Sequence, residues 1–289
     1  DCEGDGTYTS FETAEEARSA AEEMRLDVET EAFMEWFAGS KVVDEKGEPK
    51  IMYHGTSGSG FTQFDTYGSR YGLMGTGSYF TDNPEIAESY TKKGKGKTPG
   101  VYPVYLSIQK PADMDQKITA EEAKAWRRYF GDYVLDGEIK AGQTRDEALR
   151  AVERGFEQEG MLKDEAGDYV VEFFENQGFD GITHIGGQVF GGTKHRVYIA
   201  FEPTQVKSAT GNFGDFSAED ADIRFSLNKR YSYDELTAKP DATVVEIEDV
   251  GHISRDDGIA LGRDNAEANA ARHDRHGTPM VFFFFLKQY

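Results

Sequence analysis

Two short segments carry the side chains best suited to binding a small molecule. The first, Tyr53-His54-Gly55-Thr56, places a histidine directly before a glycine. The imidazole of His54 can hydrogen-bond a hydroxyl group, and Gly55 leaves its backbone N–H and C=O open to a close-lying amide. The second segment contains Tyr79, and Tyr90 follows eleven positions later (90 − 79 = 11). Two tyrosine rings at such positions could enclose a flat aromatic ligand.

The same residues also have ordinary structural interpretations. Tyr79 and Tyr90 are two of 15 tyrosines and could simply be core aromatics. Gly75 and Gly77 fit a turn. They do not form a dinucleotide-binding fingerprint, because no strand and helix with a downstream acidic residue accompany them. The order and spacing of the two segments, rather than any single residue, therefore favour a binding site.

Other candidate groups are dispersed along the chain. His184 and His195 have no clustered partners in the sequence, so no metal site is predicted. The charged segment Arg272-His273-Asp274-Arg275-His276 is more typical of a solvated loop than of a nuclease site. The segment Glu246-Ile247-Glu248 is typical of an exposed strand face. The basic, glycine-rich segment 92–97 is predicted to be a surface loop, with contact to the phosphates of a ligand as the less favoured alternative.

The overall composition limits the classes of partner. The chain has 289 residues, 38% hydrophobic and 13% aromatic, with a net charge of -21. The aromatic content supports a packed core, while the negative charge disfavours non-specific binding to nucleic acid or to an anionic membrane. No run approaches the roughly 18 apolar residues of a membrane span. Cys2 is the single cysteine, so no internal disulfide can form. A reducing compartment fits this, as does any compartment where disulfides are not used, and we expect the protein in the cytoplasm. Both ends suggest a piece of a longer polypeptide.

The predicted elements mix helix and strand irregularly. Residues 11–38 are predicted to be helical, with Thr13 and Glu16 spaced as a capping box. Asn83 and Pro84 begin another helix. Residues 118–177 are predicted to be mostly helical, with a break around 131–142. Short strands are predicted at 50–54, 79–80, 101–108, 179–185, 197–201 and 205–208.

This mixture predicts an α+β fold rather than a doubly wound parallel sheet. We expect an N-terminal helical extension at 1–30 and a main domain at 31–227. A small C-terminal α/β piece, itself truncated, is expected at 228–289. Within that piece we predict a strand at 243–247, a helix at 260–271 and a strand at 280–286.

Taken together, the two segments resemble the His–Tyr–Glu class of ADP-ribosyltransferases, which includes the poly(ADP-ribose) polymerases and diphtheria toxin. The polymerases carry His-Gly-Ser or His-Gly-Thr, then Gly-x-Gly-x-Tyr-Phe-Ala-Asp, then a second tyrosine eleven positions after the first. The wider pattern over 31–227, including the segment 201–212, resembles the transferase domains of phage and mobile-element polyvalent proteins. The resemblance implies a split β-sheet core with flanking helices.

The resemblance also implies what each site residue does. NAD+ would be the substrate, and no metal would take part. His54 would bind a ribose hydroxyl, and Gly55 would bind the nicotinamide carboxamide. Tyr79 and Tyr90 would stack on the nicotinamide ring, and Thr56 would line the pocket. His54 and Tyr79 would be the catalytic residues.

One position departs from the family pattern. The catalytic glutamate of the polymerases opens a strand that aligns with residues 197–206, and Val197 stands in its place. Because valine can neither hydrogen-bond a ribose nor accept a proton, single ADP-ribose transfer is favoured over polymer synthesis. Glu202 lies five positions away, which in a strand would put it on the opposite face. The alternative is a catalytically weak or inactive module that binds NAD+ or ADP-ribose.

The resemblance implies a protein or another macromolecule as the acceptor. The expected setting is the cytoplasm of a bacterial cell, with delivery by a phage and toxin-like action as one version of this hypothesis. A third hypothesis assigns the effector activity to residues 228–289, for which no chemistry is predicted.

Overall fold

The computed structural model describes residues 9–23, 30–65, 74–93, 96, 98–135, 137–187, 192–212 and 216–224. All of them belong to one compact unit, Asp1–Ser226, which is described here by itself. The predictions made for residues 228–289, including those for 246–248 and 272–276, lie outside the described residues.

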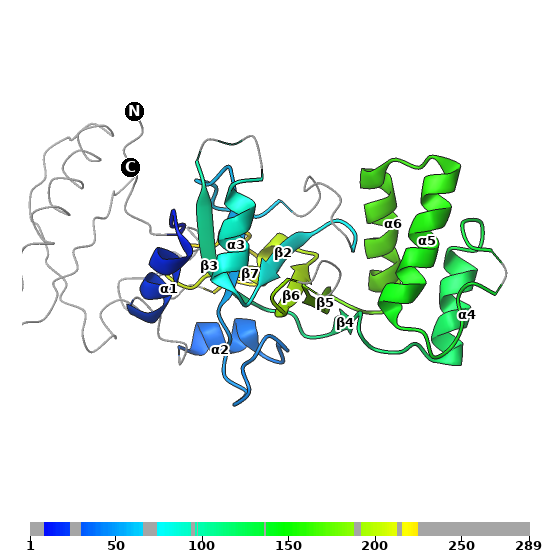
Figure 1. The fold of residues 1–289 in the computed structure, drawn as a ribbon. Helices are drawn as coiled ribbons and strands as arrows, with labels where there is room; N and C mark the ends of the chain where they lie inside the picture. Colours follow the sequence, from blue (N-terminus) through cyan, green and yellow to red (C-terminus); the bar gives the residue numbers. More distant parts are fainter. Residues whose placement is uncertain are drawn as a thin grey trace, which may run out of the picture. The chain divides into compact units, whose positions relative to one another are not determined.

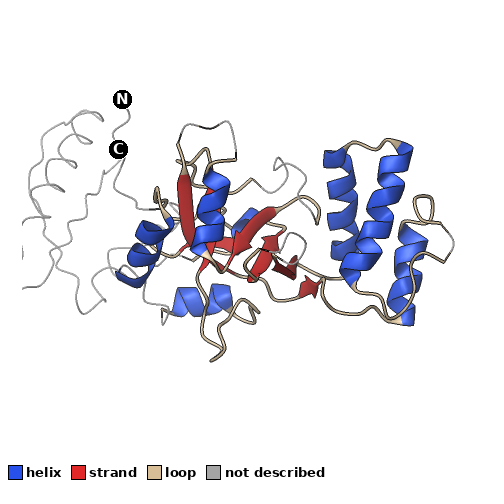
Figure 2. Cartoon of the chain, in the orientation of Figure 1, coloured by secondary structure: helices blue, strands red, loops and turns tan. Residues whose placement is uncertain are grey.

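An open mixed sheet of seven strands forms the centre of the unit, in the order β4-β5-β6-β2-β1-β3-β7 (Figures 1 and 2). Strands β4 and β5 pair in parallel, and the other neighbours pair antiparallel. This confirms the predicted α+β fold. The strands are β1 (Met52–Thr56), β2 (Ser78–Thr81), β3 (Gly100–Leu106), β4 (Pro111–Asp113), β5 (Gly181–Gly186), β6 (His195–Ala200) and β7 (Val206–Ser208).

The sheet divides between β1 and β2. Strand β1 pairs with β3 along all five of its residues, and β2 pairs with β6 along all four of its own. By contrast, β1 and β2 share a single residue pair among the described residues, Tyr53 with Thr81. The two strands therefore separate just beyond Tyr53, where His54, Gly55 and Thr56 follow.

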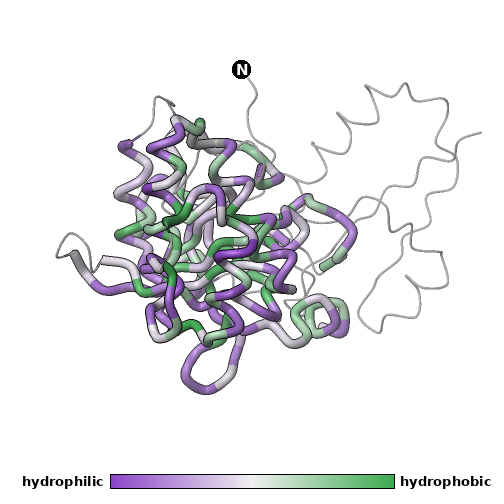
Figure 3. Tube along the Cα trace, turned by 90° about the vertical axis from the view of Figure 1, so that its right-hand side faces the viewer, coloured by the Kyte–Doolittle hydropathy of each residue, from purple (hydrophilic) through white to green (hydrophobic). Residues whose placement is uncertain are grey.

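The helices pack against the sheet in three groups, one of which is α2 alone, with Phe33, Trp36 and Phe37 in one cluster with Tyr105 of β3. α1 and α3 contact each other and the strands β1 and β3. α4, α5 and α6 are inserted between β4 and β5, and their apolar side chains share one core cluster with Ile182, Val197 and Ile199 of the sheet. Hydrophilic and hydrophobic residues are interleaved along the described trace, as Figure 3 shows. The helices are α1 (Ala14–Glu23), α2 (Glu31–Phe37), α3 (Pro84–Thr91), α4 (Ala120–Tyr129), α5 (Arg145–Glu159) and α6 (Lys163–Asn176).

The predicted helix 11–38 is wrong as a continuous element. Phe11 forms an isolated bridge with Val101 of β3 instead of beginning a helix. α2 has its own start, because the Thr30 side chain accepts a hydrogen bond from the N–H of Phe33 at 3.3 Å. The capping box is confirmed, with Glu16 N–H donating to Thr13 Oγ1 at 3.2 Å and Thr13 N–H donating to Glu16 Oε2 at 3.2 Å.

The start of α3 is as predicted. Asn83 is its N-cap and accepts a hydrogen bond from the N–H of Ile86 at 3.0 Å, and Pro84 occupies the first turn. Proline suits this position because its missing N–H would have no partner in the helix. The interrupted helical region is also confirmed, since α4, α5 and α6 fall within 118–177 with a break before α5.

The loop before β2 lies tightly between β6 and α6. Gly75 and Gly77 both have positive φ, +105° and +132°, which favours glycine. A Cβ on Gly75 would lie 3.2 Å from Val170 Cγ1 of α6. The Thr76 hydroxyl donates to Asp168 Oδ1 of the same helix at 3.0 Å. The inserted helices therefore fix the loop that leads into Tyr79.

Replacing Gly77 with alanine should destabilise the unit. The added Cβ would lie 2.7 Å from Ile199 Cγ2 and 2.9 Å from the Ala200 carbonyl oxygen. We expect the free energy of unfolding in urea to fall by about 1–3 kcal/mol, since a packed site must move to admit the methyl group. Gly58→Ala is the control, because its Cβ would meet no atom within 4 Å. Equal losses in the two variants would contradict the packing described.

Candidate functional site

His54 lies where β1 and β2 separate. Its Nδ1 is 2.8 Å from the carbonyl oxygen of Tyr79 on β2. A carbonyl oxygen can only accept, so the ring must donate from Nδ1. A neutral imidazole with its proton on Nδ1 keeps a lone pair on Nε2. His54 therefore spans the gap between the strands and retains one nitrogen able to accept a hydrogen bond from a hydroxyl group.

Aromatic side chains surround the half-buried imidazole of His54. Phe64 and Phe80 lie with ring centroids 5.1 and 5.6 Å from it, and Tyr102 lies at 6.5 Å. Burial among these rings lowers the pKa of His54 below its ordinary value, although the hydrogen bond to Tyr79 opposes the change. The neutral form is therefore favoured, which is the form that carries the acceptor lone pair.

Gly55 allows helix α3 to approach β1 closely. A Cβ on Gly55 would lie 1.7 Å from the Ala87 carbonyl oxygen, so no other residue fits here without moving the helix. Tyr90 follows Ala87 by about one helical turn. The contact at Gly55 thus brings the second tyrosine of the motif towards the end of β1.

Tyr79 is held by its hydroxyl group and by its ring. The hydroxyl donates to the Gly75 carbonyl at 2.7 Å and accepts from the Met74 N–H at 3.1 Å. Burial is the main cause that raises the pKa of Tyr79; the Met74 hydrogen bond opposes it, while Glu153 and Tyr90 add smaller rises. Because the hydroxyl is neutral and doubly engaged, Tyr79 can serve as a fixed aromatic wall rather than as an acid or base.

Tyr90 and Thr56 occupy the more open parts of the region. Tyr90 is 52% exposed near the end of α3, and the ammonium of Lys93 lies 3.9 Å from its ring centroid. Thr56 ends β1, and its hydroxyl accepts a hydrogen bond from the Gly58 N–H at 3.2 Å. The structure thus joins His54 and Tyr79 directly, places Gly55 against the helix that carries Tyr90, and sets Thr56 at the start of the following loop.

Val197 lies in β6 between two strands. Its register partners are Thr81 on β2 and His184 on β5, so all three side chains share one face of the sheet. Val197 is 7% exposed and belongs to the core cluster shared with α4, α5 and α6. The half-buried His184 has its pKa lowered, mainly by burial. No carboxylate is supplied at position 197.

Glu202 does not lie in a strand, so the argument from strand alternation does not apply to it. β6 ends at Ala200, and Glu202 precedes a short 3-10 helix, Pro203–Gln205. Its side chain is exposed and is close enough to Glu175 of α6 to raise the pKa of that carboxyl group, after burial as the main cause. Glu202 therefore belongs to the far end of β6 from Val197.

Three neighbours of the motif residues were not predicted from the sequence. Phe64 and Tyr102 pack on His54, and Glu153 of α5 lies within electrostatic reach of Tyr79. Phe64 stands outside the described helices and strands, and Glu153 belongs to an inserted helix about 70 residues away from Tyr79 in sequence. The motif spacing carries no information about such contacts. The pairing of His184 with Val197 likewise needs the register of β5 and β6.

Two features are absent from the described part of the chain. It contains no cluster of three or more histidine, cysteine, aspartate or glutamate side chains arranged to hold a metal ion. None of its helices combines the length and the apolar character needed to cross a membrane.

The site residues lie in an open mixed sheet flanked by helices. The family model for the ADP-ribosyltransferase in polyvalent proteins matches residues 44–216, which is more than half of the chain. The chain therefore belongs to this family, and the resemblance to the transferase domains of polyvalent proteins is confirmed. No curated protein and no solved structure matches the chain.

The lowered pKa of His54 predicts a pH dependence of stability. Below the ordinary value of 6.5, the unfolded chain binds a proton at this position more readily than the folded one. The free energy of unfolding should therefore fall as the pH drops from about 7.5 to 5.5, by up to about 1.4 kcal/mol for each unit of pKa shift.

Chemical denaturation at several pH values checks this. His54→Gln should flatten the dependence, and adding His184→Gln should flatten it further, because burial lowers the pKa of both side chains. A slope that is the same in wild type and in His54→Gln would show that His54 is not buried as described.

Proposed function

We propose that the domain binds NAD+ and transfers a single ADP-ribose to a macromolecular acceptor. The observation that carries the proposal is the junction of β1 and β2, where His54 bonds the Tyr79 carbonyl inside a domain of this family. His54, Gly55, Thr56, Tyr79 and Tyr90 are the proposed binding residues. The lone pair of Nε2 on a neutral His54 suits a ribose hydroxyl.

The proposed reaction requires one bond to break and one to form. The bond between ribose C1′ and the nicotinamide nitrogen breaks, and its electron pair stays on the nitrogen, so that nicotinamide leaves neutral. An acceptor nucleophile bonds to C1′ and loses its proton to solvent or to a base. The ribose carries positive charge in between, as in glycoside hydrolysis. Tyr79 would hold the leaving ring, and His54 would orient a ribose hydroxyl.

Val197 is the reason for proposing single transfer. A carboxylate at this position would orient the ribose and help to activate an incoming hydroxyl group, and valine does neither. Extension of a chain would need that activation at every step. An acceptor that carries its own acidic group could assist its own reaction, so single transfer is compatible with Val197.

The same position supports a second candidate function. A module that binds NAD+ or ADP-ribose without cleaving the glycosidic bond would need the rings of Tyr79 and Tyr90, but it would not need a glutamate at position 197. Calorimetry with NAD+, run beside an assay for released nicotinamide, separates the two candidates. Binding without release would favour the module.

The direct test is incubation with NAD+ labelled on its adenylate part, together with a bacterial lysate, followed by mass spectrometry of the labelled products. We expect nicotinamide release and a single ADP-ribose on one or a few macromolecules. Binding of NAD+ with neither transfer nor hydrolysis across several lysates would contradict transferase activity.

Restoring the carboxylate should raise turnover. In Val197→Glu we expect nicotinamide to be released at least roughly tenfold faster, since a positioned carboxylate can stabilise the ribose cation and accept a proton. Val197→Gln is the matched control, because it has the same size without the charge. Both variants should bind NAD+ in calorimetry. Equal rates in the two would argue against position 197 facing the reacting ribose.

Substitutions of Tyr79 should separate its ring from its hydroxyl. Tyr79→Phe removes the bonds to Gly75 and Met74, so the free energy of unfolding should fall by about 1–2 kcal/mol while affinity for nicotinamide stays near that of wild type. Tyr79→Ala removes the wall itself, and affinity should fall about tenfold. Calorimetry with nicotinamide measures the affinity of each variant. Equal affinity for nicotinamide in wild type, Tyr79→Phe and Tyr79→Ala would show that nicotinamide does not stack on Tyr79.

A further inference from the structure

The end of α3 places a positive charge on the ring that the proposed function assigns to nicotinamide stacking. The Lys93 N–H donates to the Tyr90 carbonyl at 3.1 Å, which closes a tight turn after the helix. That turn brings the Lys93 ammonium to 3.9 Å from the centroid of the Tyr90 ring. A cation at this distance over an aromatic face is attracted by the electron-rich face of the ring.

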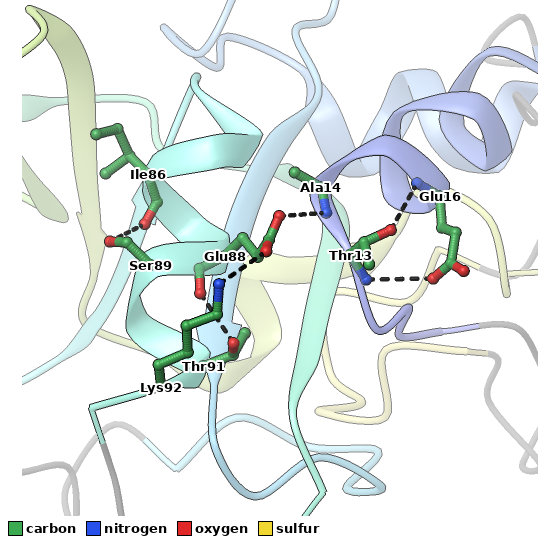
Figure 4. A network of polar contacts seen from close by, with 8 residues as sticks. All are labelled: Thr13, Ala14, Glu16, Ile86, Glu88, Ser89, Thr91 and Lys92. Carbon is green, nitrogen blue, oxygen red and sulfur yellow. Dashed lines mark hydrogen bonds and ion pairs between the residues drawn. The ribbon is translucent and has the colours of Figure 1, made fainter.

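The neighbouring lysine is bound differently. Lys92 Nζ pairs with Glu88 Oε1 at 3.2 Å, one turn back along α3. Figure 4 shows this pair beside helix α1, where Glu88 Oε2 also accepts the N–H of Ala14 at 3.1 Å. Lys92 and Lys93 thus carry the same charge at adjacent positions, but one contacts a carboxylate and the other an aromatic ring.

The nicotinamide ring of NAD+ is itself a cation, and it becomes neutral when the glycosidic bond breaks. An aromatic face that attracts an ammonium also attracts a pyridinium ring, and it attracts neutral nicotinamide less. Tyr90 is 52% exposed, so its ring is accessible to a ligand. Lys93 and the oxidised nicotinamide ring would therefore compete for the same kind of contact on the same side chain.

We propose that Lys93 occupies the nicotinamide-stacking face of Tyr90 and must be displaced by the cationic ring of NAD+. This inference rests on the proposed function, because it takes Tyr90 as part of the nicotinamide subsite. Lys93 then weakens binding of NAD+. After the bond breaks, the ammonium returns to the ring and favours departure of the neutral product. Lys93 thus lowers the affinity of the Tyr90 face for any ring that must displace it, whether that ring is charged or neutral.

The test compares Lys93→Gln with Lys92→Gln by calorimetry. The two changes remove the same charge from adjacent positions, so they alter the general field for the diphosphate alike. The probes are NAD+, the 1-methylnicotinamide cation and neutral nicotinamide. Lys93→Gln should bind NAD+ and the methylated cation about two- to fivefold more tightly than wild type, as expected from loss of an exposed cation–π competitor. Lys92→Gln should bind no more tightly than wild type, and Lys93→Arg should remain close to it.

The outcomes distinguish this inference from the proposed function. If wild type binds NAD+ but Lys93→Gln binds it equally or more weakly, the inference is overturned and the proposed function stands. Weaker binding in Lys93→Gln would point to a contact with the diphosphate instead. An equal gain in Lys92→Gln would also overturn the inference, because the effect would be one of net charge. If wild type binds none of the three probes, both proposals fail together.

Discussion

The structure depends on one constraint: β1 and β2 must separate beyond Tyr53 and still be held together by contacts on either side of that residue. Past Tyr53 the strands no longer pair, and the Tyr79 carbonyl is bonded by the ring of His54 instead of by a β1 amide. Beside this point, Lys50 pairs with Asp82 at 2.7 Å, and Asp82 Oδ1 accepts the Arg196 N–H at 2.8 Å. On one side of the Tyr53–Thr81 pair, the ion pair of Lys50 with Asp82 holds the strands together. On the other side, the imidazole of His54 lies between them, and this side chain is itself suited to binding a ligand.

The remaining elements stabilise this separation from both sides. α3 can lie on β1 because Gly55 has no side chain. The loop before β2 can lie against α6 at Gly75 and against β6 at Gly77 for the same reason. The hydroxyl of Tyr79 then ties that loop to its own strand. The burial that favours a neutral His54 and the packing that immobilises Tyr79 therefore arise from the same arrangement, and side chains that are already fixed cost less ordering on binding.

The sequence predicted the local features best. The caps of α1 and α3, the approximate positions of all the described strands except β4, and the mixed fold follow from residue types at fixed spacings, and so does the family motif. It did not predict the break between α1 and α2, since Thr30 as an N-cap competes with a long amphipathic pattern. Strand register placed His184 beside Val197, and tertiary packing placed Glu153 near Tyr79. Neither follows from spacing, because residues far apart in sequence meet only through the sheet and the inserted helices.

The most direct test of this account is a crystal structure of the protein with nicotinamide. We expect the ring between Tyr79 and Tyr90 and its carboxamide on the backbone N–H and C=O of Gly55. The His54 Nδ1 should still bond the Tyr79 carbonyl. Nicotinamide bound elsewhere, or a His54 ring turned away from β2, would contradict the claim that the separation of these two strands creates the site.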